Sequence, residues 1–122
     1  MRIHTRQKNT KITQYILKKV ESYYSSTDEM DINSFSIEHI MPISTQKTCV
    51  TRIGNLLPLG IELNSNIGNK NFKQKMMSYK KSKYESVIKF ISEYENEENW
   101  TEGCINRRTS KIAEILYNKK TE

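Results

Sequence analysis

The chain has 122 residues, which fits a single domain over 1–122 with a modest core. Its net charge of +6, with 28% charged and only 35% hydrophobic residues, favours a polyanionic partner such as nucleic acid, although a solvated lysine-rich surface gives the same balance. No apolar run approaches the roughly 20 residues of a membrane span, and the first residues lack a secretory signal pattern, so we expect a cytoplasmic protein without a membrane partner.

A helix is predicted over residues 10–24, because apolar residues recur there at helical spacing. These apolar positions are Ile12, Tyr15, Ile16, Val20 and Tyr23. Lys18, Lys19 and Glu21 are expected on the outer, solvated face. The polar residues 25–33 predict a loop.

Two short strands are predicted in the middle of the chain. The sequence SFSIEHI (34–40) alternates apolar and polar residues, and IGNLLPLG (53–60) is an apolar run that contains Gly54 and ends at Gly60. Pro58 predicts that the second strand lies at a sheet edge or ends early, because proline cannot donate to a ladder. Residues 41–52, between the strands, have no period and predict a loop.

Helical spacing returns from Ile61 onward. Phe72, Met76 and Tyr79 predict one amphipathic helix, and residues 84–91 predict another. A last helix is expected after Thr101 as its N-cap. Its apolar side holds Ile105, Ile112, Ala113 and Leu116. The predicted fold class is therefore α+β and mostly helical, with a small two-stranded element surrounded by helices.

Four polar residues gather around that small β element. Glu38 and His39 end the first strand, Asn55 begins the second, and Asn64 follows nine positions later. A neutral imidazole accepts a proton from water near neutral pH, and carboxylate and amide oxygens are hard ligands for Mg²⁺ or Mn²⁺. These side chains are the ones required to hydrolyse a phosphodiester with one divalent cation.

The pattern EHIMP…GNLLPL…LNSN resembles the HNH (His-Me finger, ββα-metal) nuclease motif. In that family an acidic residue and a histidine end the first strand, an Asn-Leu pair opens the second, and an Asn or His nine positions on binds the metal. The resemblance implies a ββα-metal core at about 34–70. Many such nucleases carry a zinc ribbon, but Gly60 and Leu63 stand at its cysteine positions, so no structural zinc is expected.

A narrower resemblance covers roughly residues 35–116. The blocks IGNLLPL and LNSNIGNKNFKQKMMSYKKS, followed by the pattern W-x4-I-x2-R-x3-IA, resemble the C-terminal HNH domain of GmrSD-type, modification-dependent restriction endonucleases. Matching positions include Asn69, Lys70, Phe72, Lys75, Tyr79, Ser82, Trp100, Ile105 and Arg108.

Carried over by position, the resemblance implies a role for each site residue. His39 would be the general base, and Glu38 and Asn64 the ligands of one Mg²⁺ or Mn²⁺ ion. Asn55 would orient His39 and brace the loop. Asn66 and Asn69 are lesser candidates for the metal or its waters. Four basic residues are candidates for contact with DNA, namely Lys70, Lys73, Lys75 and Arg108. For Lys70, Lys75 and Arg108, which match basic positions of the family, the resemblance equally implies a role in stabilising the site.

Each assignment has a structural alternative. A histidine at a strand end is usually structural or simply exposed, Asn55 after a glycine could only shape a turn, and Asn64 could only cap a helix. The lysines could form a solvated face, and Arg108 could form a half-buried ion pair. Phe72, Tyr79 and Trp100 favour core packing over stacking on bases.

The sequence therefore predicts a metal-dependent DNA endonuclease, acting in restriction of phage or foreign DNA. The alternatives are an inactive DNA-binding module and an RNA-cleaving, toxin-like HNH enzyme. The resemblance also implies an N-terminal nucleotide-hydrolysing domain or partner, so we expect this chain to be a C-terminal fragment or separate module. Because one such site cuts one strand, cutting both would require a homodimer or a second encounter.

Overall fold

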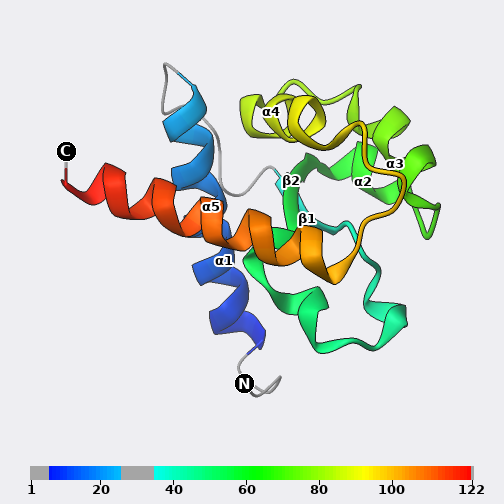
Figure 1. Cartoon of the computed structure of the whole chain (residues 1–122), viewed down its shortest axis with the longest axis horizontal. Coiled ribbons are helices and arrows are strands. Elements are labelled where there is room, and N and C mark those ends of the chain that lie inside the picture. Colours follow the sequence, from blue (N-terminus) through cyan, green and yellow to red (C-terminus); the bar gives the residue numbers. More distant parts are fainter. Residues whose placement is uncertain (1–5, 26–34, 122) are drawn as a thin grey trace.

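The computed structural model describes residues 6–25 and 35–121. Its α-helices and strands, in chain order, are α1 (Arg6–Tyr24), β1 (Phe35–His39), β2 (Leu56–Gly60), α2 (Ile61–Ser65), α3 (Phe72–Tyr79), α4 (Glu85–Tyr94) and α5 (Glu102–Thr121). Between β1 and β2 the chain forms three short 3-10 helices, η3 (Ile43–Thr45), η4 (Thr48–Thr51) and η5 (Ile53–Asn55). Figure 1 shows α5 crossing α1, with the two strands and helices α2 to α4 gathered on the side away from the C-terminus. The expected mostly helical α+β architecture with a two-stranded element is confirmed. Apart from Ser25, the loop predicted at 25–33 lies outside the described residues.

The two strands form an antiparallel sheet in which His39 pairs with Leu56 and Glu38 pairs with Leu57. Pro58 lies opposite Ile37. In a sheet of two strands, each strand is an edge strand. A proline is tolerated there, because an edge strand has one side on which no N–H donor is needed. The edge placement predicted from Pro58 is therefore confirmed.

The two faces of this sheet have different surroundings. Side chains alternate along a strand, so Glu38 shares a face with its partner Leu57, and His39 shares the opposite face with Leu56. Leu57 and Leu59 are fully buried in the main hydrophobic core. Glu38 therefore points toward the core side of the sheet, and His39 points away from it.

An aromatic cluster forms the centre of this core. Trp100 lies 5.6 Å from Phe72, 5.2 Å from Phe90 and 5.1 Å from Tyr94, measured between ring centroids. Tyr79 makes an edge contact with Phe90 at 6.1 Å. The rings lie at the spacing that favours aromatic pairs. Phe72, Tyr79 and Trp100 are thus core residues, as the sequence favoured over stacking on bases.

The buried face of α1 differs from the predicted one. Val20 is buried as predicted, but Ile12, Tyr15 and Tyr23 are exposed, and Leu17 and Glu21 are buried in their place. The reason is a contact between two helices that are distant in the sequence. The Glu21 carboxylate accepts backbone N–H groups of Glu85 and Ser86, both at 2.8 Å, at the start of α4. These bonds satisfy two donors that a helix N-terminus leaves without partners, and they compensate the burial of the charge.

Replacing Glu21 by glutamine should lower the free energy of unfolding by about 1–3 kcal/mol, because an amide cannot accept both backbone donors as the carboxylate does. Urea denaturation followed by circular dichroism measures this difference. Glu114→Gln is the matched control, since Glu114 is an exposed residue of α5. Equal stabilities of the two variants would contradict the capping role of Glu21.

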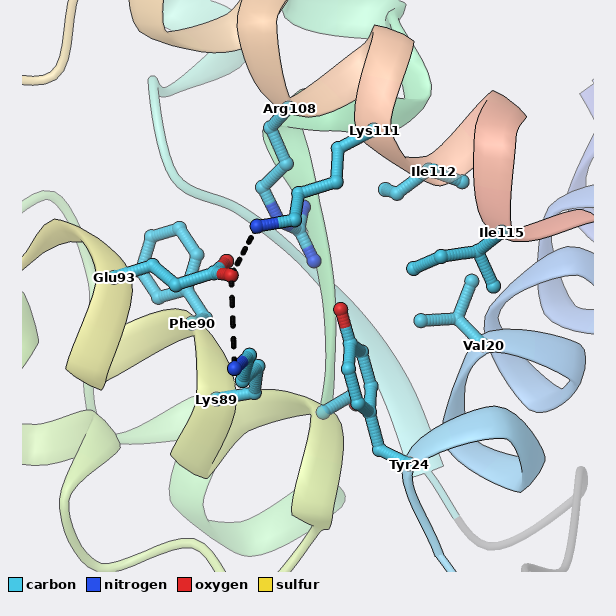
Figure 2. Close-up of a pocket in the computed structure, with 10 residues that line it drawn as sticks. Val20, Tyr24, Lys89, Phe90, Glu93, Arg108, Lys111, Ile112 and Ile115 are labelled. Carbon is cyan, nitrogen blue, oxygen red and sulfur yellow. Dashed lines mark hydrogen bonds and ion pairs between the residues drawn. The ribbon is translucent and has the colours of Figure 1, made fainter.

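Three helices meet at a small internal cavity, shown in Figure 2. Val20 and Tyr24 come from α1, Phe90 and Glu93 from α4, and Lys111 from α5. Glu93 forms ion pairs with Lys111 and, at 3.9 Å, with Lys89. The volume of about 10 Å³ is near the minimum for a single water. The cavity is therefore a packing feature of the helix junction, and the candidate site lies elsewhere.

Candidate functional site

His39 ends β1 and is half-buried. Burial lowers the pKa of its imidazole, Glu38 opposes this effect, and the positive charge of Lys75 lowers the pKa further. The net direction is downward, so the ring is neutral at pH 7 and able to accept a proton. Among the described residues, no hydrogen bond engages either ring nitrogen.

Two surface concavities meet at His39. The smaller, the Glu38 chamber, has a volume of about 230 Å³ and is lined in part by Glu38, His39, Asn69 and Lys75. The larger, the α1 groove, has a volume of about 790 Å³ and runs between the first turns of α1 and the His39 face of the sheet. His39 is the polar strand residue common to both. The contacts around His39 therefore determine what each concavity can hold.

Glu38 is buried, and one carboxylate oxygen holds two partners. Its Oε2 lies 2.8 Å from the Lys75 ammonium and accepts the Tyr79 hydroxyl at 2.7 Å. Burial and the neighbouring carboxylate raise the pKa of Tyr79, so its hydroxyl stays protonated as a donor. No hydrogen bond from the described residues engages Oε1, and the side chain lines the Glu38 chamber.

Lys75 lies inside the protein, with 1% of its surface exposed. Besides pairing with Glu38, its ammonium donates to the carbonyls of His39 at 2.8 Å and Ile40 at 3.1 Å. All of its hydrogen-bonding capacity is thus used internally. We therefore revise its predicted contact with DNA: the structure assigns Lys75 to holding the Glu38 carboxylate and the backbone at the end of β1.

Asn55 is completely buried and holds the loop that follows His39. Its amide nitrogen donates to the carbonyls of Met41 and Val50, both at 3.0 Å. Its amide oxygen accepts the Met41 N–H at 2.7 Å and the Trp100 indole N–H at 3.0 Å. A side chain in this position cannot reach a substrate. Of the roles that the resemblance implied for Asn55, its contacts are those of a residue that holds the loop in place.

Helix α5 supports that loop from behind. Arg108 is buried and donates to the carbonyls of Gly54 at 3.0 Å and Leu56 at 2.9 Å, with Phe90 beneath its guanidinium. Burial lowers its pKa to about 10, which leaves it charged at neutral pH. Thr109 accepts the Gly54 N–H at 3.0 Å. Because Arg108 is buried, the prediction that it contacts DNA is corrected. The alternative of a half-buried ion pair is also corrected, since the partners of its guanidinium are backbone carbonyls.

Gly54 is required where α5 meets the loop. A Cβ atom at this position would lie 2.2 Å from the Ile105 carbonyl oxygen and 2.6 Å from the Thr109 nitrogen. Both are backbone atoms of α5, so they cannot move aside independently of the helix. The glycine before Asn55 therefore reflects close approach of two backbone segments.

Asn64 lies near the end of α2, alongside β1. Its amide nitrogen donates to the Ser36 hydroxyl at 2.6 Å and to the Ile37 carbonyl at 3.4 Å. No described residue donates to its amide oxygen. The alternative that Asn64 only caps a helix is wrong, because α2 begins at Ile61 and Gly60 precedes it as the cap.

The residues that make these contacts lie within a stretch that a protein-family model matches. The family model for the C-terminal domain of GmrSD restriction endonucleases matches residues 1–115. The chain belongs to this family. The resemblance predicted from the sequence is confirmed. No curated protein and no solved structure matches the chain.

The region that matches the GmrSD C-terminal domain contains every candidate site residue, from Glu38 to Arg108. Membership of a restriction endonuclease family indicates nuclease activity. No helix in the described part of the chain is long and apolar enough to cross a membrane.

The donors at the site differ from those of a histidine- or cysteine-rich metal centre. Within 6–25 and 35–121, no group of three or more His, Cys, Asp or Glu side chains could hold a metal ion. The two predicted oxygen donors are Oε1 of Glu38, which lines the Glu38 chamber with His39, and Oδ1 of Asn64, which lies against Ser36 and Ile37 of β1 and does not line that chamber. Such a sparse set of hard oxygen ligands suits a cation that keeps several waters, as Mg²⁺ does.

The remaining predicted basic residues lie on the surface. Lys70 and Lys73 are exposed, and their ammonium groups touch only the backbone carbonyls of Asn66 at 3.5 Å and Glu95 at 3.4 Å. Both are thus accessible to an anionic partner. Asn69, beside Gly68 with its positive φ of 63°, lines the Glu38 chamber. The predicted DNA contacts of Lys70 and Lys73 stay predictions.

Sequence reasoning missed the partners of Glu38. The sequence pattern predicts Tyr79 only as a core residue and Lys75 only as part of a basic face or a group at the site. A signal was present, because Lys75 lies three positions after Phe72 and four before Tyr79, on the apolar side of α3. A lysine within an apolar stripe indicates a buried carboxylate partner, since an isolated buried charge is unfavourable.

Proposed function

We propose that this domain is an HNH-type, ββα-metal endonuclease that hydrolyses DNA phosphodiester bonds in a restriction system. One observation carries the proposal: a neutral, half-exposed histidine stands at the end of β1, and its flanking backbone is fixed from both sides. Lys75 binds the carbonyls of His39 and Ile40, and Asn55 binds both backbone groups of Met41. Fixing a catalytic base in this way lowers the reorganisation that the reaction requires.

In the proposed reaction, His39 removes a proton from a water molecule. The water oxygen attacks phosphorus in line, the bond to the 3′ oxygen breaks, and that oxygen takes a proton from solvent. The products carry 5′-phosphate and 3′-hydroxyl ends. The lowered pKa of His39 suits this role, because the ring is available as a base at neutral pH.

The proposed cofactor is one Mg²⁺ or Mn²⁺ ion held by Glu38 Oε1 and Asn64 Oδ1, and no described residue engages either oxygen. When bound, the ion would neutralise charge on the scissile phosphate and the leaving oxygen. The ion pair with Lys75 offsets part of the Glu38 charge. We therefore expect weak binding that the phosphate of the substrate completes.

Two features of the larger assembly belong to the same proposal. The family resemblance implies a nucleotide-hydrolysing domain or subunit that controls cleavage. A single His39 site per chain implies nicking by a monomer and double-strand cleavage by a homodimer.

The test is incubation of the purified domain with supercoiled plasmid in Mg²⁺ or Mn²⁺, with EDTA as the control. We expect conversion to the nicked form with either ion and none in EDTA. Nicking that persists in EDTA would contradict metal dependence. DNA binding without nicking in every metal would favour an inactive binding module, and preferential cleavage of RNA would favour the toxin-like alternative.

A further inference from the structure

The α1 groove borders the His39 site, and nothing in the proposed chemistry uses it. Its floor is the His39 face of the sheet, formed by Phe35, Ile37 and Leu56. Its opposite wall is the N-terminal half of α1, with Thr10, Thr13 and Gln14. The volume of about 790 Å³ lies within the range of sites that hold small organic groups.

The lining defines the chemistry of an occupant. The floor is hydrocarbon, and the wall offers hydroxyl groups and one amide, which both donate and accept hydrogen bonds. Among the described residues that line the groove, none carries a permanent charge. A neutral, flat group with polar edges fits such a site, whereas a phosphate chain or an acidic peptide would find no cation there.

The position of His39 connects this groove to the Glu38 chamber, because its side chain lines both. A phosphate attacked beside His39 would therefore have its neighbouring nucleoside at the mouth of the α1 groove. A base that remains stacked in a duplex cannot enter a side pocket, and enzymes that bind single bases first take them out of the stack.

We propose that the α1 groove receives one unstacked nucleobase of the strand being cut, adjacent to the scissile phosphate. This inference rests on the proposed nuclease function and adds a substrate requirement to it. The preferred substrate is DNA that is locally unpaired next to the cleavage position. Gln14, whose amide resembles the groups that pair with base edges, is the candidate to contact the base edge.

The first experiment compares nicking of two oligonucleotide duplexes that differ only by a central mismatched bubble. We expect the duplex with the bubble to be cut about tenfold faster or more, because its bases are already unpaired and binding does not have to supply the free energy of unpairing. Thr13→Phe, which fills the groove, should abolish that preference. Ile12→Phe is the matched control, since Ile12 adjoins Thr13 but is exposed and does not line the groove. Equal rates for the two duplexes with the wild-type domain would overturn the inference.

A second measurement separates this inference from the nuclease proposal. In EDTA, a duplex with 2-aminopurine in the bubble should bind the wild-type domain about tenfold more tightly than it binds Thr13→Phe, because the filled groove can no longer receive the base. If this difference in affinity is found but no cleavage is seen, the nuclease proposal is rejected and the base-binding groove is supported. If plasmid is nicked but the two affinities are equal, the base-binding groove is rejected and the nuclease proposal is supported. If Thr13→Phe does not fold, Thr51→Phe on the opposite rim replaces it, with Thr48→Phe as its control.

Discussion

Replacing His39 by alanine is expected to lower the rate of plasmid nicking by about 10²–10⁴-fold, the usual contribution of a positioned general base. The fold should persist, because the side chain is half-exposed and the backbone around it is held by Lys75 and Asn55. Initial rates in Mn²⁺, normalised to folded protein by circular dichroism, measure the loss.

Thr48→Ala is the matched control for this variant. Thr48 is exposed on the loop between the strands and lines neither the Glu38 chamber nor the α1 groove. Its nicking rate should equal that of the wild type. Unchanged nicking by His39→Ala would show that another group is the base, or that the activity belongs to a contaminant.

The pH profile gives an independent check on His39. The pKa of this residue is lowered, so the neutral, basic form persists below the ordinary histidine value of about 6.5. The rate should stay constant as pH falls through 6.5 and decline only at the lower pKa. An acid limb with its midpoint above 6.5 would not be consistent with His39 as the base in this environment.

The second large effect is expected for Lys75→Met, which should lower the free energy of unfolding by about 3–5 kcal/mol. The substitution leaves the buried Glu38 carboxylate without its cation and the carbonyls of His39 and Ile40 without their donor. Urea denaturation measures the change.

Two variants make this test specific. Lys73→Met lies two positions earlier on α3 in an exposed site, so its stability should change by no more than about 0.5 kcal/mol. Glu38→Gln combined with Lys75→Met should recover part of the lost stability, because no buried charge remains. If Lys73→Met and Lys75→Met were equally stable, the internal role of Lys75 would be wrong.

The local elements and the order of the site residues could be predicted from the sequence. Both strands, the Pro58 edge and the Thr101 cap follow from short-range rules, and the structure contains each of them. His39 at a strand end and Asn55 at the next strand start are likewise local facts. These features depend on neighbours within a few positions, which a single sequence displays.

The burial of charged side chains could not be predicted in the same way. Glu21, Lys75 and Arg108 each have partners between 35 and 65 positions away, and those partners are carbonyls, backbone N–H groups or one carboxylate. Backbone groups exist at every position, so no sequence pattern indicates which of them a distant charge will meet. Hydrophobic spacing therefore assigned the wrong face of α1 and an exposed position to Lys75.

The support that α5 gives to Gly54 and Asn55 has a consequence for synthesis. The loop after His39 depends on Trp100, Arg108 and Thr109, which leave the ribosome about 50 residues after it. At about 5–20 residues per second, the strands would exist for several seconds before these supports appear. A nascent chain would thus contain His39 without the framework that fixes it, and the competence to cut DNA would arise only once the final helix has been made.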